Sequence, residues 1–245
     1  MVSRKRKKRR KYITFKQILP NMITSGNILT GVLSLVLAWH GHILPAAWLV
    51  PVAGIFDFMD GKVARALGGS SSFGVELDSL ADVVSFGVAP AMIFYSAYMK
   101  GFWGVAGALV IAFYVLCGAL RLARFNVTSF LSAFQGLPIP AAGTFLAAFV
   151  VAGHTLPPLA AAVITFCTGA LMISNLRYSN FKMLHARNLS KAKTSALAIL
   201  LVILFVVFRS AMPLAAVSLY VASGLVGFDW GKWLATDNDE ATEEI

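Results

Sequence analysis

The chain has 245 residues, of which 58% are hydrophobic and 13% are charged, and its formal net charge is +10. Soluble domains carry about 25% charged residues, so this composition argues against a soluble protein. The hydrophobic runs are continuous rather than alternating, which argues against an outer-membrane barrel, and they reach the length of about 20 residues that a helix needs to cross a bilayer. The sequence therefore predicts an all-α, polytopic integral membrane protein.

The chain begins with a basic segment, residues 1–17, which carries nine lysines and arginines. An arm that binds nucleic acid is one interpretation of this segment. We favour a cytoplasmic anchor beside anionic lipids, because a hydrophobic run of full membrane length follows at once. Membrane lipids rather than nucleic acid are therefore the expected partners.

Eight hydrophobic runs follow, separated by glycine, proline or charged residues, and they predict a bundle of about eight transmembrane helices. They cover residues 18–40, 43–66, 75–98, 102–124, 137–155, 158–176, 194–209 and 212–228. If the N-terminus is cytoplasmic, 19 of the 21 lysines and arginines fall at cytoplasmic ends or loops, and only Lys100 and Arg209 do not. Because cytoplasmic loops are enriched in Lys and Arg, both termini are expected in the cytoplasm, including the acidic tail at 229–245.

The first predicted span carries a polar stripe near its cytoplasmic end. Asn21, Thr24 and Asn27 recur in steps of three residues and therefore share one face of the helix. Hydrogen bonding between helices, or capping, would account for these residues, and so would contact with a polar ligand. The pattern alone leaves both interpretations open.

Four aspartates lie near the cytoplasmic ends of the second and third spans. Asp57 and Asp60 are three residues apart on one helix, and Asp78 and Asp82 are four apart on the next, so each pair shares a helix face. The connection between these helices is short, so they are expected to be antiparallel neighbours whose acidic faces can meet. Carboxylates at membrane depth are costly and are normally paired or bound to metal, so the four predict a metal site.

The chemistry of such a site follows from its ligands. Carboxylate oxygens favour Mg²⁺, Mn²⁺ or Ca²⁺ over zinc and copper. Two such ions about 3.5–4 Å apart are typical of phosphoryl transfer, and Arg65 is close enough along the helix to hold a phosphate oxygen. A cation transporter that uses the same carboxylates is the alternative. We favour it less, because an ion pathway distributes its acids in depth and these cluster at one end.

The acidic run resembles the signature of the CDP-alcohol phosphotransferase family. Every motif position is matched, in the pattern Asp57-x2-Asp60-Gly61-x2-Ala64-Arg65-x8-Gly74-x3-Asp78-x3-Asp82. The resemblance implies a six-helix core over residues 18–180, followed at 181–228 by a cytoplasmic loop and two additional helices. It also implies an enzyme with Mg²⁺ or Mn²⁺, two ions being expected, that transfers the phosphatidyl group of a CDP-linked lipid to an alcohol and releases CMP.

The same resemblance implies roles for individual residues. Asp57, Asp60 and Asp78 would be metal ligands, and Asp82 would lie close to the metal and act as the general base. The implied contacts with the CDP-lipid are Asn21, Thr24, Asn27, Gly61, Ala64, Arg65 and Gly74.

Three further segments, 77–90, 121–126 and 136–140, resemble the membrane-embedded phosphatidylserine synthases of that family. They imply L-serine as the acceptor, CDP-diacylglycerol or its archaeal ether equivalent as the donor, and a possible homodimer. The guanidinium groups of Arg121 and Arg124, with Asn126 beyond them, would bind the serine carboxylate, although the positive-inside rule alone would also account for the two arginines. Glycerol 3-phosphate or inositol phosphate is the alternative acceptor.

Overall fold

The protein is all-helical. The computed structural model describes residues 15–69, 71–101, 104–128, 136–176 and 211–228, together with the single residues 178, 193, 195 and 233. Its helical elements in chain order are α1 (Phe15–Trp39), α2 (Ile43–Ala66), α3 (Ser72–Asp82), η1 (Val83–Val88), α4 (Ala89–Phe94), η2 (Tyr95–Met99), α5 (Val105–Thr128), α6 (Ile139–Val151), α7 (Pro158–Ile173) and α9 (Met212–Val226).

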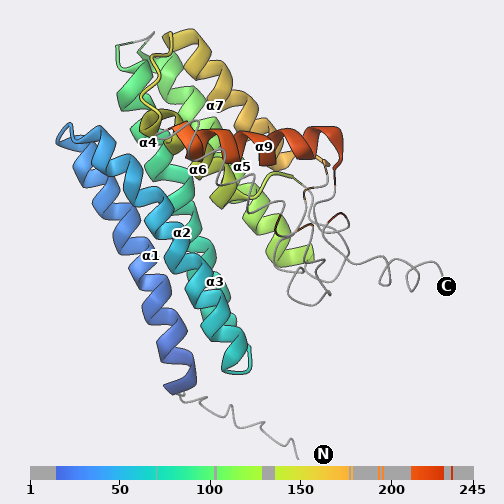
Figure 1. The fold of residues 1–245 in the computed structure, drawn as a ribbon. Helices are drawn as coiled ribbons and strands as arrows, with labels where there is room; N and C mark the ends of the chain where they lie inside the picture. Colours follow the sequence, from blue (N-terminus) through green and yellow to red (C-terminus); the bar gives the residue numbers. More distant parts are fainter. Residues whose placement is uncertain are drawn as a thin grey trace, which may run out of the picture.

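Helices α1 and α2 form an antiparallel hairpin (Figure 1). Their tight connection contains Gly41 with φ of 84°, a conformation that glycine adopts at little cost. Ser34 Oγ on α1 donates a buried 2.8 Å hydrogen bond to the carbonyl of Ala46 on α2. Near the middle of the pair, a Cβ added to Gly26 would lie 3.0 Å from the ring of Phe56, so the glycine lets the helices approach closely. These contacts fix the register in which α1 faces the acidic end of α2.

The third helix runs without a break from Ser72 to Met99, through α3, η1, α4 and η2, and η1 and η2 are π-helical turns. Ser71 begins it, because its side chain accepts a 3.0 Å hydrogen bond from the amide of Gly74. Further along, Ser85 Oγ donates a 2.9 Å hydrogen bond to the carbonyl of Asn27. The third helix is thereby held against α1, with its N-terminal turns next to the end of α2.

The remaining helices complete a core behind these three. Helix α5 packs along α7, and α6 lies against α4 and η1. The phenol of Tyr114 on α5 donates a buried 3.0 Å hydrogen bond to the carbonyl of Phe86. Phe86, Ile139 and Leu146 are fully buried around it. This packing fixes the third helix from the side opposite α1.

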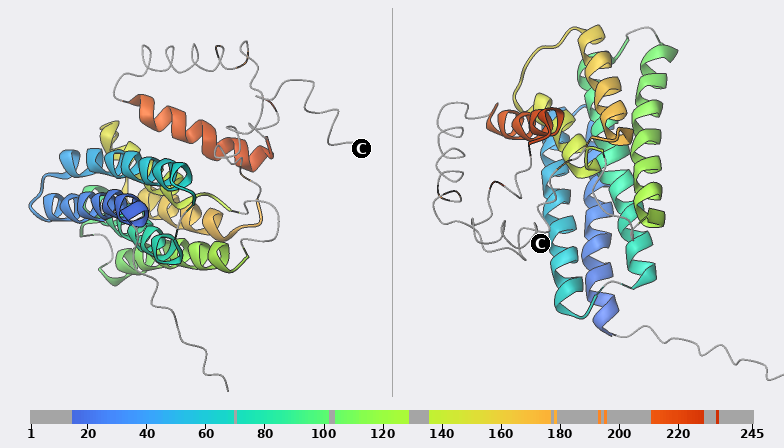
Figure 2. Two further views of the ribbon diagram at one scale, coloured as in Figure 1. Left: turned by 90° about the horizontal axis from the view of Figure 1, so that it is seen from below. Right: turned by 90° about the vertical axis from the view of Figure 1, so that its right-hand side faces the viewer.

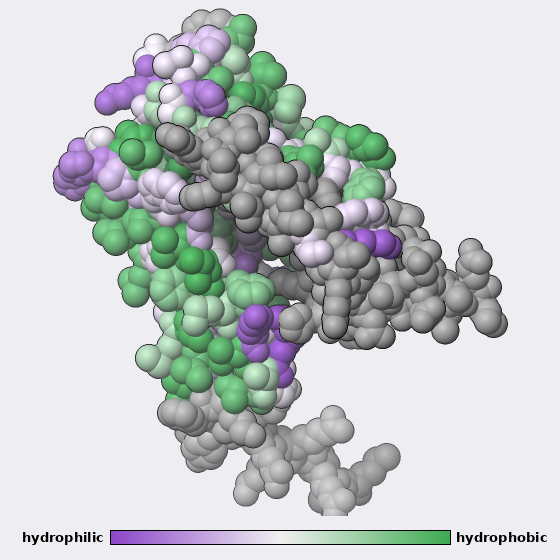
Figure 3. All heavy atoms as spheres, in the orientation of Figure 1, coloured by the Kyte–Doolittle hydropathy of each residue, from purple (hydrophilic) through white to green (hydrophobic). Residues whose placement is uncertain are grey.

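Four of the eight predicted spans coincide with helices that are long and apolar enough to cross a membrane, namely Ile18–Trp39, Ile43–Ala66, Ser72–Met99 and Val105–Val127. Hydrophobic side chains cover much of the visible flank of the α1–α2 hairpin (Figure 3). Leu29 and Leu33 of α1 are among those exposed. Such a surface suits contact with lipid, and the chain is an integral membrane protein.

Three of the other four predicted spans, 137–155, 158–176 and 212–228, differ from the structure. Helices α6 and α7 have 13 and 16 residues and are shorter than predicted. Helix α9 lies across the bundle instead of alongside its helices, as two directions of view show (Figures 1 and 2). An apolar run predicts that a helix is buried but not its direction, and α9 packs against α6. The seventh predicted span, 194–209, lies outside the described residues apart from Ser195, as do most of the basic segment and the acidic tail.

Candidate active site

Three of the four aspartates form one cluster where α2 ends and α3 begins. One carboxylate oxygen from each of Asp57, Asp60 and Asp78 lies within 4.8 Å of the others. Asp60 is buried, and the other two are half-buried. Three carboxylates this close repel one another unless a cation or protons balance them. An all-oxygen donor set of this size suits a hard divalent ion, so the cluster could hold Mg²⁺ or Mn²⁺.

Asp82 lies one helical turn beyond Asp78 and is outside this three-residue cluster. Its side chain is only 7% exposed. It interacts electrostatically with the guanidinium of Arg121 on α5. The third helix therefore carries two carboxylates in different surroundings, one beside the α2 acids and one beside a buried arginine.

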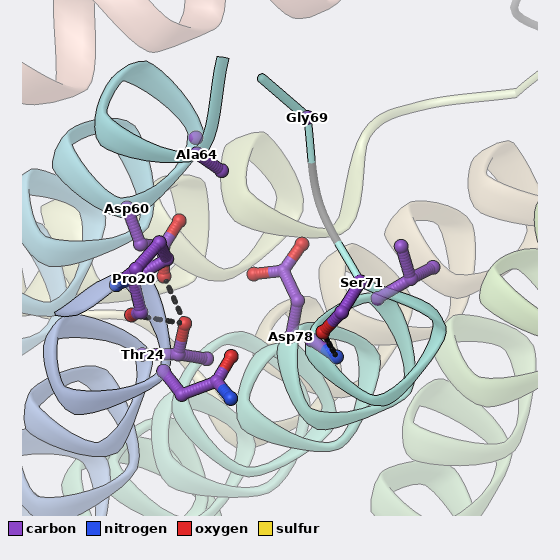
Figure 4. Close-up of a pocket in the computed structure, with 11 residues that line it drawn as sticks. Pro20, Thr24, Asp60, Ala64, Gly69, Ser71 and Asp78 are labelled. Carbon is purple, nitrogen blue, oxygen red and sulfur yellow. Dashed lines mark hydrogen bonds between the residues drawn. The ribbon is translucent and has the colours of Figure 1, made fainter. Parts of the chain in front are cut away.

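Thr24 links the first helix to the acidic cluster. Its hydroxyl lies 2.7 Å from Oδ2 of Asp60 and 3.1 Å from the carbonyl of Pro20, within hydrogen-bonding distance of both (Figure 4). Thr24 is 3% exposed. For Thr24, the prediction of hydrogen bonding between helices is therefore confirmed. The bond restrains the orientation of the Asp60 carboxylate from a neighbouring helix.

A pocket opens beside these groups, between α1, the end of α2 and the start of α3 (Figure 4). Asp60 and Asp78 face it from opposite sides (Figure 4). Its lining comprises Pro20, Asn21, Thr24, Asp60, Gly61, Ala64, Gly69, Ser71, Gly74, Val75 and Asp78. Five of the residues predicted to contact a CDP-lipid thus share one pocket with the carboxylates of Asp60 and Asp78: Asn21, Thr24, Gly61, Ala64 and Gly74.

Two glycines in this lining leave room that a larger residue would fill. A Cβ at Gly74 would lie 3.0 Å from Oδ1 of Asn21 and 3.3 Å from Oγ of Ser71. A Cβ at Gly61 would lie 3.3 Å from Nη1 of Arg65, so the guanidinium passes over this glycine. Arg65 is itself exposed, in the last turn of α2. Glycine at both positions keeps polar atoms accessible to a bound molecule.

Asn27 differs from the other two residues of the predicted polar stripe. It is fully buried and is absent from the pocket lining, one turn deeper in α1 than Thr24. Neither polar atom of its side chain has a hydrogen-bond partner among the described residues. The stripe is therefore divided, with Asn21 and Thr24 at the pocket and Asn27 in the interior.

The three residues predicted to bind the acceptor lie on α5 beside the third helix and the end of α7. Arg121 is 6% exposed and is the one that interacts with Asp82. Asn126 Nδ2 donates a 3.0 Å hydrogen bond to Oγ of Ser79 on α3. Arg124 Nη2 instead donates a 2.9 Å hydrogen bond to the carbonyl of Ile173, the last residue of α7. Of the two arginines, Arg121 is thus the one that interacts with Asp82, whereas Arg124 joins α5 to the end of α7.

Sequence reasoning missed several residues of the site. Ser71 and Val75 line the pocket, and the serines before α3 were a signal for a helix cap that could have identified Ser71.

Comparison with known proteins places these residues in a family context. The family model described as CDP-alcohol phosphatidyltransferase matches residues 17–173. A CDP-diacylglycerol–serine O-phosphatidyltransferase of Helicobacter pylori is 36% identical over 228 residues, which cover 89% of this chain and 91% of the relative. The Bacillus subtilis protein of the same description is 39% identical over 178 residues, 71% of this chain and 97% of the relative.

An archaeal protein and a solved structure are also similar. The archaetidylserine synthase of Methanothermobacter thermautotrophicus is 42% identical over 171 residues, 69% of this chain and 72% of that protein. The crystal structure of the Mycobacterium tuberculosis phosphatidylinositol phosphate synthase with CDP-DAG bound is matched with a TM-score of 0.47 and 21% identity, covering 63% of this chain and 80% of that one.

Proposed function

Because this chain belongs to the CDP-alcohol phosphatidyltransferase family, we propose that it transfers the phosphatidyl group of CDP-diacylglycerol to the hydroxyl of L-serine. The products are phosphatidylserine and CMP. The observation that carries the proposal is the clustering of Asp57, Asp60 and Asp78, whose oxygens lie within 4.8 Å of one another beside a pocket. The serine acceptor is supported by relatives of that description at 36% and 39% identity.

The reaction exchanges one phosphorus–oxygen bond for another. The serine hydroxyl oxygen forms a bond to the phosphorus nearest the lipid, and the bond from that phosphorus to the bridging oxygen breaks. CMP leaves with the bridging oxygen and its electron pair. Asp57, Asp60 and Asp78 would hold Mg²⁺ or Mn²⁺, which when bound neutralises the diphosphate and stabilises the leaving CMP.

The protein's own groups hold the reactants and move the proton. Asn21, Thr24 and Gly74 would contact the cytidine nucleotide at the pocket wall, and Arg65, whose guanidinium passes over Gly61, would bind a phosphate oxygen. Asp82 would accept the proton of the serine hydroxyl. A carboxylate can do this when it lies within hydrogen-bond reach of a positioned hydroxyl, and the shared surroundings of Asp82 and Arg121 support that assignment.

The acceptor would bind beside α5. A guanidinium presents a planar fork of donors that matches a carboxylate, and the buried Arg121 next to Asp82 is the best placed of the predicted residues. Binding there would bring the hydroxyl of the amino acid toward Asp82. Arg124 and Asn126 would support this region through their contacts with α7 and α3.

The distribution of basic residues supports a proposal for the side of the membrane toward which the pocket opens. The pocket lies at the end of the bundle that contains the start of α1, the end of α2 and the start of α3. Lys62 and Arg65 lie at that end, so the positive-inside rule supports a pocket that opens toward the cytoplasm. Association as a homodimer stays a prediction.

An acceptor panel tests the proposed reaction. Purified protein is supplied with CDP-diacylglycerol, a divalent ion and one of three alcohols, namely L-serine, glycerol 3-phosphate or inositol phosphate, and CMP release is measured. We expect only serine to stimulate release. Stimulation by a phosphorylated alcohol alone would reject the serine assignment while keeping the family chemistry. Metal-dependent ion flux in proteoliposomes without CMP formation would favour the transporter.

A further inference from the structure

Asn27 on α1 is a fully buried amide side chain whose two polar atoms have no hydrogen-bond partner among the described residues. Burial of a polar group without a partner is costly, so native proteins rarely keep one unless another group satisfies it. The predicted contact with a CDP-lipid does not account for Asn27, because this residue is absent from the pocket lining. The position of Asn27 among its neighbours indicates a different partner.

The packing of α1 against α2 places Asn27 at the height of Asp57. The two helices are antiparallel, and the hydroxyl of Thr24 lies 2.7 Å from Oδ2 of Asp60. Because both helices rise equally per residue, a step of three residues forward along α1 corresponds to about three residues backward along α2. Asn27, three residues after Thr24, therefore lies opposite Asp57, three residues before Asp60.

The packing of α1 against the third helix places Asn27 beside the turn that follows Asp82. Oγ of Ser85, three residues after Asp82, donates a 2.9 Å hydrogen bond to the backbone carbonyl of Asn27. A Cβ at Gly31 would lie 2.9 Å from the Cα of Ser85, so this glycine also packs on the third helix. Asn27 is three residues from Thr24 and four from Gly31, and it therefore shares a helix face with both. That face lies toward the seam between α2 and the third helix, the two helices that carry the acids.

A cation held by these acids would supply the missing hydrogen-bond partner. One oxygen from each of Asp57, Asp60 and Asp78 lies within 4.8 Å of the others. A Mg²⁺ ion bound by carboxylates usually keeps several of its water molecules, and a bound cation makes such a water more acidic and hence a stronger donor. The side-chain carbonyl of Asn27 is a neutral acceptor, so it can hold a coordinated water without adding negative charge to the cluster.

We propose that Asn27 is a positioning residue of the metal site, and that its side-chain carbonyl accepts a hydrogen bond from a water coordinated to the divalent ion. The ion would thereby be restrained on its inner side, one helical turn deeper in α1 than Thr24. This inference rests on the metal site of the proposed function. It assigns Asn27 a role different from the predicted contact with the CDP-lipid.

Asn27→Leu tests this role, because leucine has nearly the size and shape of asparagine and no polar side-chain atom. Thermal unfolding of the purified protein is measured in excess chelator and during a titration with Mn²⁺, without CDP-diacylglycerol or serine. Mn²⁺ affinity is measured in parallel from the electron paramagnetic resonance signal of the free ion. Ser34→Ala is the matched control, because Ser34 is a buried polar residue of α1 whose hydroxyl already donates a 2.8 Å hydrogen bond to the carbonyl of Ala46.

In chelator, Asn27→Leu should unfold at the temperature of the wild type or above it, because the substitution removes polar atoms that have no partner among the described residues. Its Mn²⁺ affinity should fall about tenfold or more, as is typical when a group that holds a metal ligand in place is lost. Ser34→Ala should show the opposite pattern, with a lower unfolding temperature in chelator and unchanged Mn²⁺ affinity. Asn27→Asp keeps an oxygen acceptor and should bind Mn²⁺ at least as tightly as the wild type.

Two results would overturn the inference alone. One is wild-type Mn²⁺ affinity in Asn27→Leu, and a raised KM for CDP-diacylglycerol in that variant would then assign Asn27 to the nucleotide. The other is a lower unfolding temperature of Asn27→Leu in chelator together with weakened Mn²⁺ binding by Asn27→Asp, which would indicate a purely structural role. If the wild type does not bind Mn²⁺, or if Asp60→Asn binds it equally well, the metal site of the proposed function fails and the inference fails with it.

Discussion

The hydroxyl of Thr24 lies 2.7 Å from Oδ2 of Asp60, a hydrogen bond that joins α1 to the acidic end of α2. Both residues are buried. A metal ligand held by a neighbouring side chain is oriented before the ion arrives, and removal of such a partner typically lowers metal affinity or activity 10–100-fold. If Asp60 holds the proposed divalent ion, the first helix has a chemical role in this site in addition to its packing.

Thr24→Val tests that role, because valine keeps the shape of threonine and removes the hydroxyl. We expect kcat to fall about tenfold or more and the half-saturating Mn²⁺ concentration to rise, while Thr24→Ser retains most activity. Thr30→Val is the control, since the Thr30 hydroxyl donates a 2.7 Å hydrogen bond to the carbonyl of Gly26 within α1 itself. Equal activities for Thr24→Val and Thr30→Val would show that the bond to Asp60 has no part in the reaction.

The acidic cluster should govern both activity and metal-dependent stability. Asp60→Asn and Asp78→Asn should each lower the rate of phosphatidyl transfer about 100- to 1,000-fold, as expected when a group that stabilises transition-state charge is lost. Mn²⁺ should raise the unfolding temperature of the wild type, because a ligand that binds only the folded state stabilises it. It should not do so in either variant.

Glu76→Gln is the matched control for these substitutions, because Glu76 is an exposed carboxylate on the same helix as Asp78. Its activity and its Mn²⁺-dependent shift in unfolding temperature should equal those of the wild type. A Mn²⁺ shift that persists in Asp60→Asn and Asp78→Asn would place the ion elsewhere.

Substitution of Gly74 should weaken binding of the CDP-lipid more than binding of serine. Gly74→Ala would place a methyl group 3.0 Å from Oδ1 of Asn21 and narrow the pocket. We expect the KM for CDP-diacylglycerol to rise about tenfold with a smaller change in the KM for serine, an effect within the 1–3 kcal/mol typical of overpacking. Gly54→Ala is the control, since its Cβ would have ordinary contacts at 3.9 Å. Parallel rises in both KM values for Gly74→Ala would contradict a role limited to the nucleotide.

Substitutions of the two arginines of α5, Arg121 and Arg124, should affect different properties of the protein. Arg121→Lys should raise the KM for serine at least about tenfold, because an ammonium group lacks the planar fork of donors that fits a carboxylate. Arg124→Lys should lower the unfolding temperature more than it affects serine, since Arg124 donates a 2.9 Å hydrogen bond to the end of α7. Steady-state kinetics and thermal unfolding of both variants measure the difference. If the two variants had the same serine KM, the assignment of serine binding to Arg121 rather than Arg124 would be contradicted.

Much of this site could be predicted because local rules determine it. The spacing of Asp57, Asp60 and Asp78 places their side chains on helix faces, and a short connection leaves antiparallel packing as the expected arrangement of α2 and α3. The second predicted span, 43–66, matches the bounds of α2. Periodicity and connection length together therefore predicted that the carboxylates of Asp57, Asp60 and Asp78 come together, although not that Asp82 lies outside their cluster.

Other features depend on packing between distant segments. The π-helical turns η1 and η2 have no residue signature, and the direction of α9 is set by its contacts with α6 and Tyr178. Asn27 fits the same three-residue step as Thr24 but is buried. A periodic pattern identifies a shared face of a helix. How deep each residue of that face lies follows from the neighbouring helices, whose positions the pattern does not contain.

The central claim is that Asp57, Asp60 and Asp78 hold a divalent ion on which phosphatidyl transfer to serine depends. The most direct measurement is the incorporation of radiolabelled L-serine into lipid by the purified protein with CDP-diacylglycerol, before and after treatment with a chelator. Incorporation should stop when the ion is removed and return when Mg²⁺ or Mn²⁺ is added. Incorporation that continues in excess chelator, or that never occurs with either ion, would contradict the claim.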